Sequence, residues 1–405
     1  MAAVERYDVV IVGAGFAGMY MLHRAREMGL AARVYERGSD VGGTWYWNRY
    51  PGARCDVESM EYSYQFSEEL QQEWHWSERY SPQAEILQYA NHVADRFDLR
   101  RDIQFDTSVR SAHYQEDSGD WEVTTEAGDA VRARFVVMAT GCLSAANTPN
   151  FKGLDSFRGE TYHTGNWPHE GVDFTGKRVG IIGTGSSAIQ SIPLIAKEAE
   201  HLTVFQRTPN FSVPAGNGPL DPELEREIKA DYQGFRALNR AWPTGFGARY
   251  PAYEDSALAA SDEVRRQRLE EHWQLGGLLF LRAFADLGLD RNANEVAAEF
   301  IRDKIREIVD DPETAELLCP DTVVGCKRLC ADTDYFATFN RPNVSLVDVS
   351  KQPIDEITPA GVKTGGVEYE LDALVFATGF DAMTGALLAV DIRGREGRTL
   401  QDKWS

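Results

Sequence analysis

The strongest constraint on the fold is a small-residue turn that occurs twice, each time directly after a run of apolar, largely β-branched residues. The two turns are Gly13-x-Gly15-x-x-Gly18, after residues 7–12, and Gly183-x-Gly185-x-x-Ala188, after residues 177–182. A buried strand that enters such a turn and continues as a helix opens a Rossmann βαβ unit, in which alanine can replace the third glycine. The sequence therefore predicts an α/β fold with two Rossmann-like dinucleotide-binding domains.

The residue that ends the second strand of each unit indicates which dinucleotide binds there. Glu36 follows Gly13 by 23 residues, where a carboxylate accepts hydrogen bonds from ribose hydroxyls and repels a 2′-phosphate. Arg207 follows Gly183 by 24 residues, and arginine pairs with phosphate through two parallel hydrogen bonds. The first unit should bind FAD or NAD and the second NADP, which together indicate a flavin reduced by a nicotinamide. The alternatives are turns that serve packing alone and an Arg207 that is only a solvated cation.

The rest of the chain can be divided around these two units. Residues 103–141 and 343–379 echo each other, since both run through short β-like stretches into Ala-Thr-Gly, which predicts an antiparallel excursion that returns to a parallel sheet. Residues 222–318 carry long amphipathic helical patterns, at 225–232, 263–273 and 293–309. The predicted domains are an FAD-binding domain (1–145 and 370–405), an NADP-binding domain (146–212 and 321–369) and a helical insertion (213–320).

Composition narrows the range of partners. The chain of 405 residues has 42 Lys and Arg against 63 Asp and Glu, a net charge of −21, so neither nucleic acid nor an anionic membrane is an expected partner. The five cysteines fit no disulfide framework, and Cys326 and Cys330 lack the further His or Cys pair of a metal site. No apolar run approaches the ~18 residues of a membrane span, and the early first strand leaves no room for a signal peptide. A cytoplasmic location is predicted, and the sequence carries no signal of oligomeric state.

The segment after the second strand excludes one large class of flavoenzymes. Disulfide reductases carry a redox-active cysteine pair there, whereas this chain has Trp45 in that neighbourhood and Cys55 alone. Two longer patterns are filled instead. The pattern FxGxxxHxxxWP is filled by Phe157, Gly159, His163, Trp167 and Pro168, and GxWxxxx(Y/F)PGxxxD by Gly43, Trp45, Tyr50, Pro51, Gly52 and Asp56. With these motifs the chain resembles the Baeyer–Villiger monooxygenases along its whole length, and most closely the cyclohexanone and phenylacetone monooxygenase branch.

The resemblance implies an enzyme in which NADPH reduces FAD and O2 then forms a C4a-peroxyflavin. This species inserts an oxygen atom next to the carbonyl of a small-molecule ketone, giving an ester or lactone. Arg328 aligns with the family's active-site arginine, whose permanent charge can stabilise the anions of the reaction, and Asp56 aligns with the acid that pairs with it. Without the resemblance, Lys327-Arg328 would be an ordinary basic pair in a surface loop. His163 and Trp167 are expected to be packed linker residues rather than catalytic ones.

The resemblance also implies a set of cofactor contacts. Flavin contacts are expected from Gly43, Thr44, Trp45, Asp56 and Tyr62, with backbone contacts to the adenine from Val109, in addition to Gly13, Gly15, Gly18 and Glu36. Contacts to the NADP pyrophosphate are expected from Gly183, Thr184, Gly185, Ser186, Ser187, Ala188 and Gln190, and to the 2′-phosphate from Arg207, Thr208 and Lys327, next to Arg328. Alternatively, the aromatic residues at 45–50 are ordinary core residues without a role in binding.

Two other functions remain open at this point. The same flavin chemistry can oxygenate sulfides or amines, so a heteroatom-oxygenating flavin monooxygenase is an alternative. The chain also stops at Trp404-Ser405, where family members continue with a segment that returns to the flavin domain. It is therefore expected to lack the C-terminal part of that domain, and a truncated flavin-binding fragment without oxygenase activity is the third hypothesis.

Overall fold

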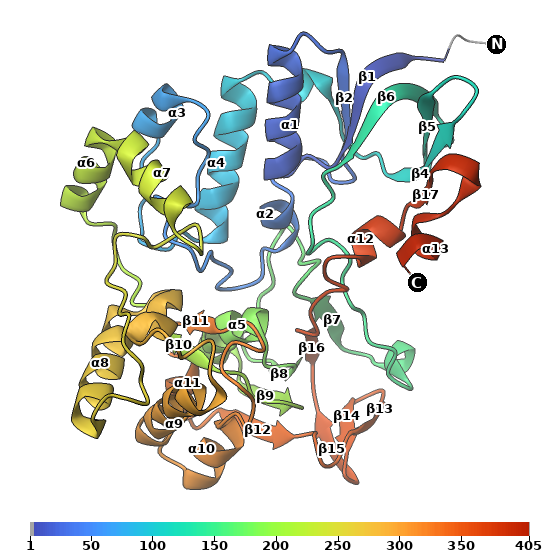
Figure 1. The fold of residues 1–405 in the computed structure, drawn as a ribbon. Helices are drawn as coiled ribbons and strands as arrows, with labels where there is room; N and C mark the ends of the chain where they lie inside the picture. Colours follow the sequence, from blue (N-terminus) through green and yellow to red (C-terminus); the bar gives the residue numbers. More distant parts are fainter. Residues whose placement is uncertain (1–3, 405) are drawn as a thin grey trace. The chain divides into compact units, whose positions relative to one another are not determined.

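The computed structural model describes residues 4–404, which form two compact units (Figure 1). Unit 1 consists of Met1–Arg49, Ala84–Asn147 and Gly379–Ser405, and unit 2 consists of Tyr50–Gln83 and Thr148–Thr378. Residues 1–3 and 405, the outer ends of the predicted flavin domain, lie outside the described residues. Each unit contains one of the two small-residue turns.

Unit 1 is built on a seven-stranded sheet in the order β17-β4-β5-β6-β1-β2-β3. Its strands are β1 (Arg6–Val12), β2 (Ala32–Tyr35), β3 (Ile103–Gln104), β4 (Val109–Gln115), β5 (Asp120–Thr125), β6 (Ala130–Met138) and β17 (Asp391–Arg393). Its helices are α1 (Phe16–Glu27), α2 (Thr44–Trp47), α4 (Gln83–Arg96), α12 (Gly385–Leu388) and α13 (Leu400–Trp404), with short 3₁₀ turns at Arg100–Asp102 and Arg395–Gly397. Apolar side chains of β1, α1 and α4 form one core cluster of this unit, among them Ile11, Leu22 and Ala90.

Unit 2 is built on a five-stranded parallel sheet in the order β12-β9-β8-β16-β7. Its strands are β7 (Glu160–His163), β8 (Arg178–Ile182), β9 (His201–Gln206), β12 (Val344–Asp348) and β16 (Ala373–Phe376). Smaller sheets are formed by β10 (Ser212–Pro214) with β11 (Cys330–Asp332), and by β13 (Ile354–Ile357), β14 (Gly361–Thr364) and β15 (Val367–Glu370). The parallel order leaves the carboxyl ends of β8 and β9 at one edge, where ligands bind in such sheets.

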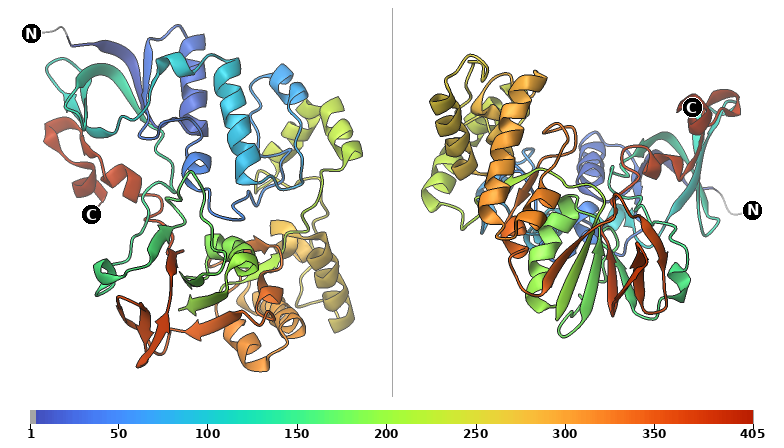
Figure 2. Two further views of the ribbon diagram at one scale, coloured as in Figure 1. Left: turned by 180° about the vertical axis from the view of Figure 1, so that it is seen from behind. Right: turned by 90° about the horizontal axis from the view of Figure 1, so that it is seen from below.

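The helices of unit 2 include the long ones that the sequence predicts. They are α3 (Glu68–Glu73), α5 (Ser186–Glu198), α6 (Pro222–Ala230), α7 (Tyr232–Ala241), α8 (Asp262–Leu275), α9 (Arg291–Ile308), α10 (Pro312–Leu318) and α11 (Tyr335–Thr338), with 3₁₀ turns at Leu154–Ser156 and Gly277–Ala283. In both views of Figure 2, α8, α9 and α10 gather on one side of the unit. The helix predicted at 225–232 ends two residues early, because Asp231 leaves the helical conformation and caps α7.

The predicted internal echo is confirmed in detail. In unit 1, β4 and β5 run antiparallel and β6 returns parallel to β1, and in unit 2 the antiparallel β13–β15 precede β16, which returns parallel to β8. The Ala-Thr-Gly after each returning strand touches the first glycine of the turn. A Cβ on Gly13 would lie 2.6 Å from the Ala139 carbonyl oxygen, and one on Gly183 would lie 2.5 Å from that of Ala377. Both glycines also have positive φ, so no larger residue fits there.

The units differ from the predicted domain boundaries in two places. Tyr50–Gln83 belongs to unit 2, although the prediction placed it in the flavin domain. The boundary at 370 is also too early, because β16 pairs with β8 and β7 inside the sheet of unit 2. Residues 213–320 lie in unit 2 together with the second turn, as expected of an insertion in the second nucleotide domain, and their apolar side chains join those of β8 and α5 in one core cluster.

Exchange of Gly183 for alanine should destabilise unit 2 by roughly 2–4 kcal/mol. Alanine would be strained at the positive φ of this position, and its Cβ would clash with a carbonyl oxygen. Gly171 is the matched control, since it has φ +80 but a Cβ there would meet nothing within 4 Å. Gly171→Ala should cost only about 1 kcal/mol. Urea unfolding of both variants followed by circular dichroism measures the difference, and equal midpoints would contradict the packing argument.

Candidate active site

The helices that follow the two turns begin without a side-chain cap. Gly15 and Gly185 are the N-cap residues of α1 and α5, and at neither helix start does a capping side chain accept a hydrogen bond from a backbone N–H. All five helices α6 to α10 are capped instead by an Asp or Ser side chain that accepts from a first-turn N–H; the caps are Asp221, Asp231, Ser261, Asp290 and Asp311. Uncapped N–H groups at a positive helix end suit the phosphates of a dinucleotide.

The backbone around both turns is shaped for close approach. Gly43 has φ +55, and a Cβ on it would lie 2.8 Å from the Gly15 Cα, which explains glycine at this position beside the first turn. Gly18 is needed because its Cβ would collide with the Gly13 carbonyl oxygen. At Gly185 a Cβ would meet nothing within 4 Å, so the start of α5 is open to a ligand. These observations fit a dinucleotide at each turn.

Glu36 lies at the end of β2, as the sequence predicts. Its Oε2 accepts from the Ala14 N–H at 2.6 Å and its Oε1 from the Gly38 N–H at 2.7 Å, which leaves further lone pairs for ribose hydroxyls. The Thr107 N–H donates to the Glu36 carbonyl at 2.8 Å, and Val109, two residues later, belongs to the same apolar cluster as Tyr35. The structure therefore brings Val109 to the end of β2, next to the predicted ribose site.

The segments predicted to bind the second dinucleotide are neighbours in unit 2. The Thr184 hydroxyl donates to the Thr208 carbonyl at 2.8 Å, which ties the second turn to the segment after β9. β10 pairs with β11, and Asn210 donates to the Arg328 carbonyl at 3.3 Å, so that segment runs beside residues 327–330. Arg207 and Lys327 are exposed cations in these two segments. Ser187, in the first turn of α5, bonds the buried Thr164 hydroxyl at 3.1 Å.

Asp56 and Arg328 form an ion pair inside unit 2, as the resemblance implies. Nη2 of Arg328 donates to Oδ2 of Asp56 at 2.8 Å, across 272 positions of the sequence. The Asp56 side chain is only 4% exposed, whereas that of Arg328 is 61% exposed. The pair thus combines a buried acid with an arginine side chain that is largely exposed. A guanidinium in this position is available to a second anion.

Burial sets the protonation chemistry around this pair. It raises the pKa of Asp56, although Arg328 acts in the opposite direction by charge and hydrogen bond. Burial also lowers the pKa of Arg328, but the charge of Asp56 and its hydrogen bond have the larger combined effect, so the pKa of Arg328 is raised. The adjacent thiols of Cys55 and Cys330 are buried, which raises the pKa of each to about 12. Both thiols are therefore protonated at neutral pH and unsuited to thiolate chemistry.

The pattern ending in Trp167-Pro168 is packed into the sheet of unit 2. Nδ1 of His163 accepts from the Gly165 N–H at 2.9 Å, and Nε2 lies 3.2 Å from the Thr378 hydroxyl. Trp167 is buried against Tyr162 and Phe174. These contacts agree with packed linker residues rather than proton donors.

The remaining predicted residues fall into both units. Thr44 and Trp45 lie on α2 in unit 1, with Trp45 buried, whereas Tyr62 lies with Asp56 in unit 2. The Gln190 side chain contacts Tyr50, Arg54 and Asp56, so its contact with a pyrophosphate stays a prediction. This link between α5 and residues 50–56 was missed by sequence reasoning, since nothing in one sequence relates positions 140 residues apart.

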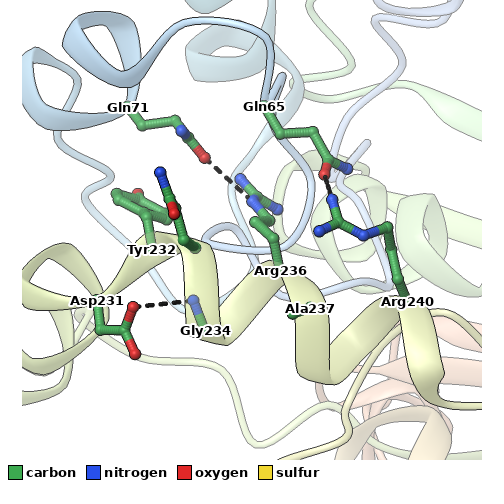
Figure 3. Close-up of a pocket in the computed structure, with 9 residues that line it drawn as sticks. Gln65, Gln71, Asp231, Tyr232, Gly234, Arg236, Ala237 and Arg240 are labelled. Atoms are coloured by element: carbon green, nitrogen blue, oxygen red, sulfur yellow. Dashed lines mark hydrogen bonds between the residues drawn. The ribbon is translucent and has the colours of Figure 1, made fainter.

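A shallow hollow of about 520 Å³ in unit 2 contains none of the predicted site residues (Figure 3). It is lined by side chains from α7 and the segment around α3, including Gln65, Gln71, Arg236 and Arg240. Arg236 donates to Gln71 at 3.2 Å and Arg240 to Gln65 at 2.9 Å, so the polar lining is internally paired. In residues 4–404 there is also no helix able to cross a membrane and no cluster of metal-ligating side chains.

Comparison with known proteins decides the family. Residues 6–213 match the flavin-binding monooxygenase-like family. The Baeyer–Villiger monooxygenase of Pseudooceanicola batsensis is 47% identical over 402 residues, which cover 98% of this chain and 73% of that protein. The chain belongs to the Baeyer–Villiger monooxygenase family. Cyclohexanone 1,2-monooxygenase of an Acinetobacter species is 43% identical over 404 residues, covering 98% of this chain and 73% of that protein.

Solved structures of Baeyer–Villiger relatives share the fold. A steroid monooxygenase bound to NADP is 57% identical with a TM-score of 0.94, covering 98% of this chain and 76% of that one. The OTEMO complex with FAD and NADP is 42% identical with a TM-score of 0.94, covering 98% and 75%. The predicted α/β fold with two Rossmann-like domains and the FAD and NADP(H) cofactors are thereby confirmed. The residues that hold each cofactor in this Baeyer–Villiger monooxygenase remain predictions.

Arg207→Ala should raise KM for NADPH by roughly 10–100-fold, because a charge-assisted phosphate contact of about 1.5–3 kcal/mol is lost. KM for NADH should stay unchanged, since NADH has no 2′-phosphate. Arg341→Ala is the control, because Arg341 is also exposed but lies at the opposite edge of the sheet. Arg341 precedes β12, whereas Arg207 follows β9, and these two strands run parallel. Steady-state kinetics with both cofactors tests this, and an equal effect on NADPH and NADH would remove Arg207 from phosphate recognition.

Proposed function

We propose that this protein is an NADPH- and O2-dependent flavin monooxygenase that inserts an oxygen atom next to a ketone carbonyl, giving an ester or lactone. The observation that carries the proposal is the largely exposed Arg328 side chain held by the buried Asp56. Relatives named for acetone, cyclopentanone and cyclohexanone are 43%, 39% and 43% identical to this chain, and all three names denote ketone oxygenation. The substrate class is accordingly a small-molecule ketone, with O2 as co-substrate and the cytoplasm as the proposed location.

FAD, when bound and reduced, supplies the activated oxygen, and NADPH supplies the hydride. The chain supplies a fixed cation. Negative charge is present on the attacking oxygen and passes to the former carbonyl oxygen of the ketone when the new C–O bond forms, and Arg328 stabilises it without giving up a proton. A cation that is already in place loses little free energy to reorganisation when the charge appears.

Asp56 acts through Arg328. It restricts the guanidinium to one orientation and, because it is an anion, keeps the net charge of the pair near zero until another anion arrives. Thr44 and Trp45 on α2 would contact the flavin, and Tyr62 would do so from the segment that carries Asp56. The start of α5 would bind the NADP pyrophosphate, while Arg207, Thr208 and Lys327 would bind the 2′-phosphate. The contact between Thr184 and Thr208 supports this grouping.

Heteroatom oxygenation is the second candidate function. Phenazine N-monooxygenase PhzNO1 of Lysobacter antibioticus is 44% identical over 406 residues, so the same framework is found in a relative named for N-oxygenation. The two functions differ in the charge that the site must stabilise. Attack on a ketone turns its carbonyl oxygen into an oxyanion next to Arg328. An amine or a sulfide has no carbonyl group, so oxygen transfer to it creates no such oxyanion. Arg328 should therefore matter far more for ketones than for sulfides.

Arg328→Ala should lower ester formation by roughly 10²–10³-fold, the usual cost of one removed oxyanion-stabilising group. NADPH should still reduce the flavin, with hydrogen peroxide released in place of ester. Arg328→Lys should recover part of the activity, because it keeps a charge but replaces the guanidinium whose Nη2 donates to Asp56. Gas chromatography of the ester, a peroxide assay and thioether oxidation are measured in parallel. Undiminished ester formation by Arg328→Ala would overturn the assignment.

The yield of ester per NADPH should fall at acid pH. Protonation of Asp56 removes the charge that holds Arg328, and burial raises the pKa of Asp56 above its ordinary value of about 3.9. The loss should therefore begin at a higher pH than for an exposed aspartate. Asp56→Asn should show a low yield that does not respond to pH in this range. The same acid limb in Asp56→Asn would assign it to another group.

A further inference from the structure

Gln190, in the second turn of α5, is bonded on both sides of its amide. The Tyr50 hydroxyl donates to its Oε1 at 2.8 Å. Its Nε2 donates to the Arg54 carbonyl at 3.2 Å and to Oδ1 of Asp56 at 3.3 Å. One side chain of α5 therefore reaches both ends of the segment 50–56.

The orientation of this amide follows from the chemistry of its partners. The Arg54 carbonyl and the Asp56 carboxylate can only accept hydrogen bonds, so both must face the NH2 group of Gln190. Oε1 then faces Tyr50, whose hydroxyl must donate. Burial raises the pKa of Tyr50, and the hydroxyl keeps the proton that it donates. The amide is thus fixed in one orientation, with its donors directed at Asp56.

The backbone strengthens the same link. Gly52 has φ +82, and a Cβ there would lie 2.2 Å from the Gln190 carbonyl oxygen, so only glycine allows this approach. The segment 50–56 therefore touches α5 at Gln190 through main chain and side chain together. The position of Asp56 depends on the helix that begins at Gly185.

The Asp56 carboxylate has one donor for each oxygen, Gln190 at Oδ1 and Arg328 at Oδ2. A carboxylate that is 4% exposed cannot replace either donor by bulk water without moving. Loss of one donor leaves a buried charged acceptor unsatisfied, which favours the protonated acid or a displaced side chain. In both cases Arg328 loses its anchor.

We propose that Gln190 is a positioning residue for oxygenation: its amide fixes Asp56 as an oriented anion, and Asp56 in turn holds Arg328. This inference rests on the proposed function for its effect on catalysis. Gln190 also links the segment that carries Asp56, where flavin contacts are predicted, to α5, which begins at the predicted pyrophosphate site.

Near neutral pH, only one of the titratable groups around Asp56 carries a charge. The titratable groups that interact electrostatically with Asp56 are Tyr50, Cys55, Cys330 and Arg328. The phenol and both thiols are neutral there, since burial raises all three pKa values. A new carboxyl group at position 190 would therefore meet Asp56 with only Arg328 to offset it.

Two variants of the 405-residue holoprotein separate positioning from packing. Gln190→Met keeps the length and volume of the side chain but removes both donors, and should lower ester per NADPH at least tenfold at every pH. Gln190→Glu faces Asp56 with a second carboxyl group, and two such groups in one site hold a proton strongly. Its ester yield should be highest at low pH and fall as pH rises, the reverse of the wild-type trend. Ser191→Ala is the control, because the Ser191 hydroxyl bonds within α5, to the Ser187 carbonyl.

A second readout does not depend on turnover. In protein labelled with ¹³C at aspartate carboxyl groups, the Asp56 signal is assigned by its loss in Asp56→Asn, and its titration midpoint is measured by NMR. The midpoint should rise by about one pH unit or more in both Gln190 variants and stay unchanged in Ser191→Ala. In the Asp56→Asn background, Gln190→Met should cause little further loss of ester yield, because the two residues act in series.

The outcomes are distinct. A wild-type yield in Gln190→Met, or an unshifted Asp56 midpoint in both variants, would overturn the positioning role. Wild-type protein that reduces FAD but converts no ketone would overturn the proposed function instead. The NMR titration would still decide whether Gln190 controls Asp56.

Discussion

The arrangement of the site depends on one costly group, the carboxylate of Asp56. A buried anion must be hydrogen-bonded and paired, because water cannot stabilise it. This chain meets the requirement with Arg328, which is 272 positions away, and Gln190, which is 134 positions away. The five-stranded sheet of unit 2, the glycine at position 52 and the pairing of β10 with β11 all help to bring these three residues together. Burial of the carboxylate costs free energy, but it makes this arrangement specific, since few arrangements of the chain satisfy both carboxylate oxygens.

Much of this fold can be read from local sequence. The strand, glycine turn and helix of each unit are short-range patterns, and in the structure residues 7–12 and 177–182 lie almost entirely in strands and each turn continues as a helix. The excursions that end in Ala-Thr-Gly were also predictable, because alternating strands and a turn leave a local signal. The pair Asp56–Arg328 was expected from family motifs alone, since no periodicity relates two residues so far apart.

The two misplaced domain boundaries share a physical cause. Residues 50–83 follow the flavin-type opening directly, yet contacts such as Tyr50 with Gln190 assign them to unit 2. The strand 373–376 reads as the start of the returning flavin segment, but its place between β8 and β7 is set by sheet pairing. Domain membership follows tertiary contacts, which a linear pattern does not contain. The end of the helix predicted at 225–232 was misplaced for a local reason, because Asp231 caps the next helix.

The bare starts of α1 and α5 have a thermodynamic consequence. The helices α6 to α10 carry their own Asp or Ser caps, whereas α1 and α5 have no side-chain cap. A phosphate bound at the predicted sites would complete each helix as a cap does. Ligand that binds only the native chain stabilises it in proportion to the logarithm of its concentration above Kd. Bound cofactor is therefore expected to raise the free energy of unfolding of this chain as well as to enable turnover.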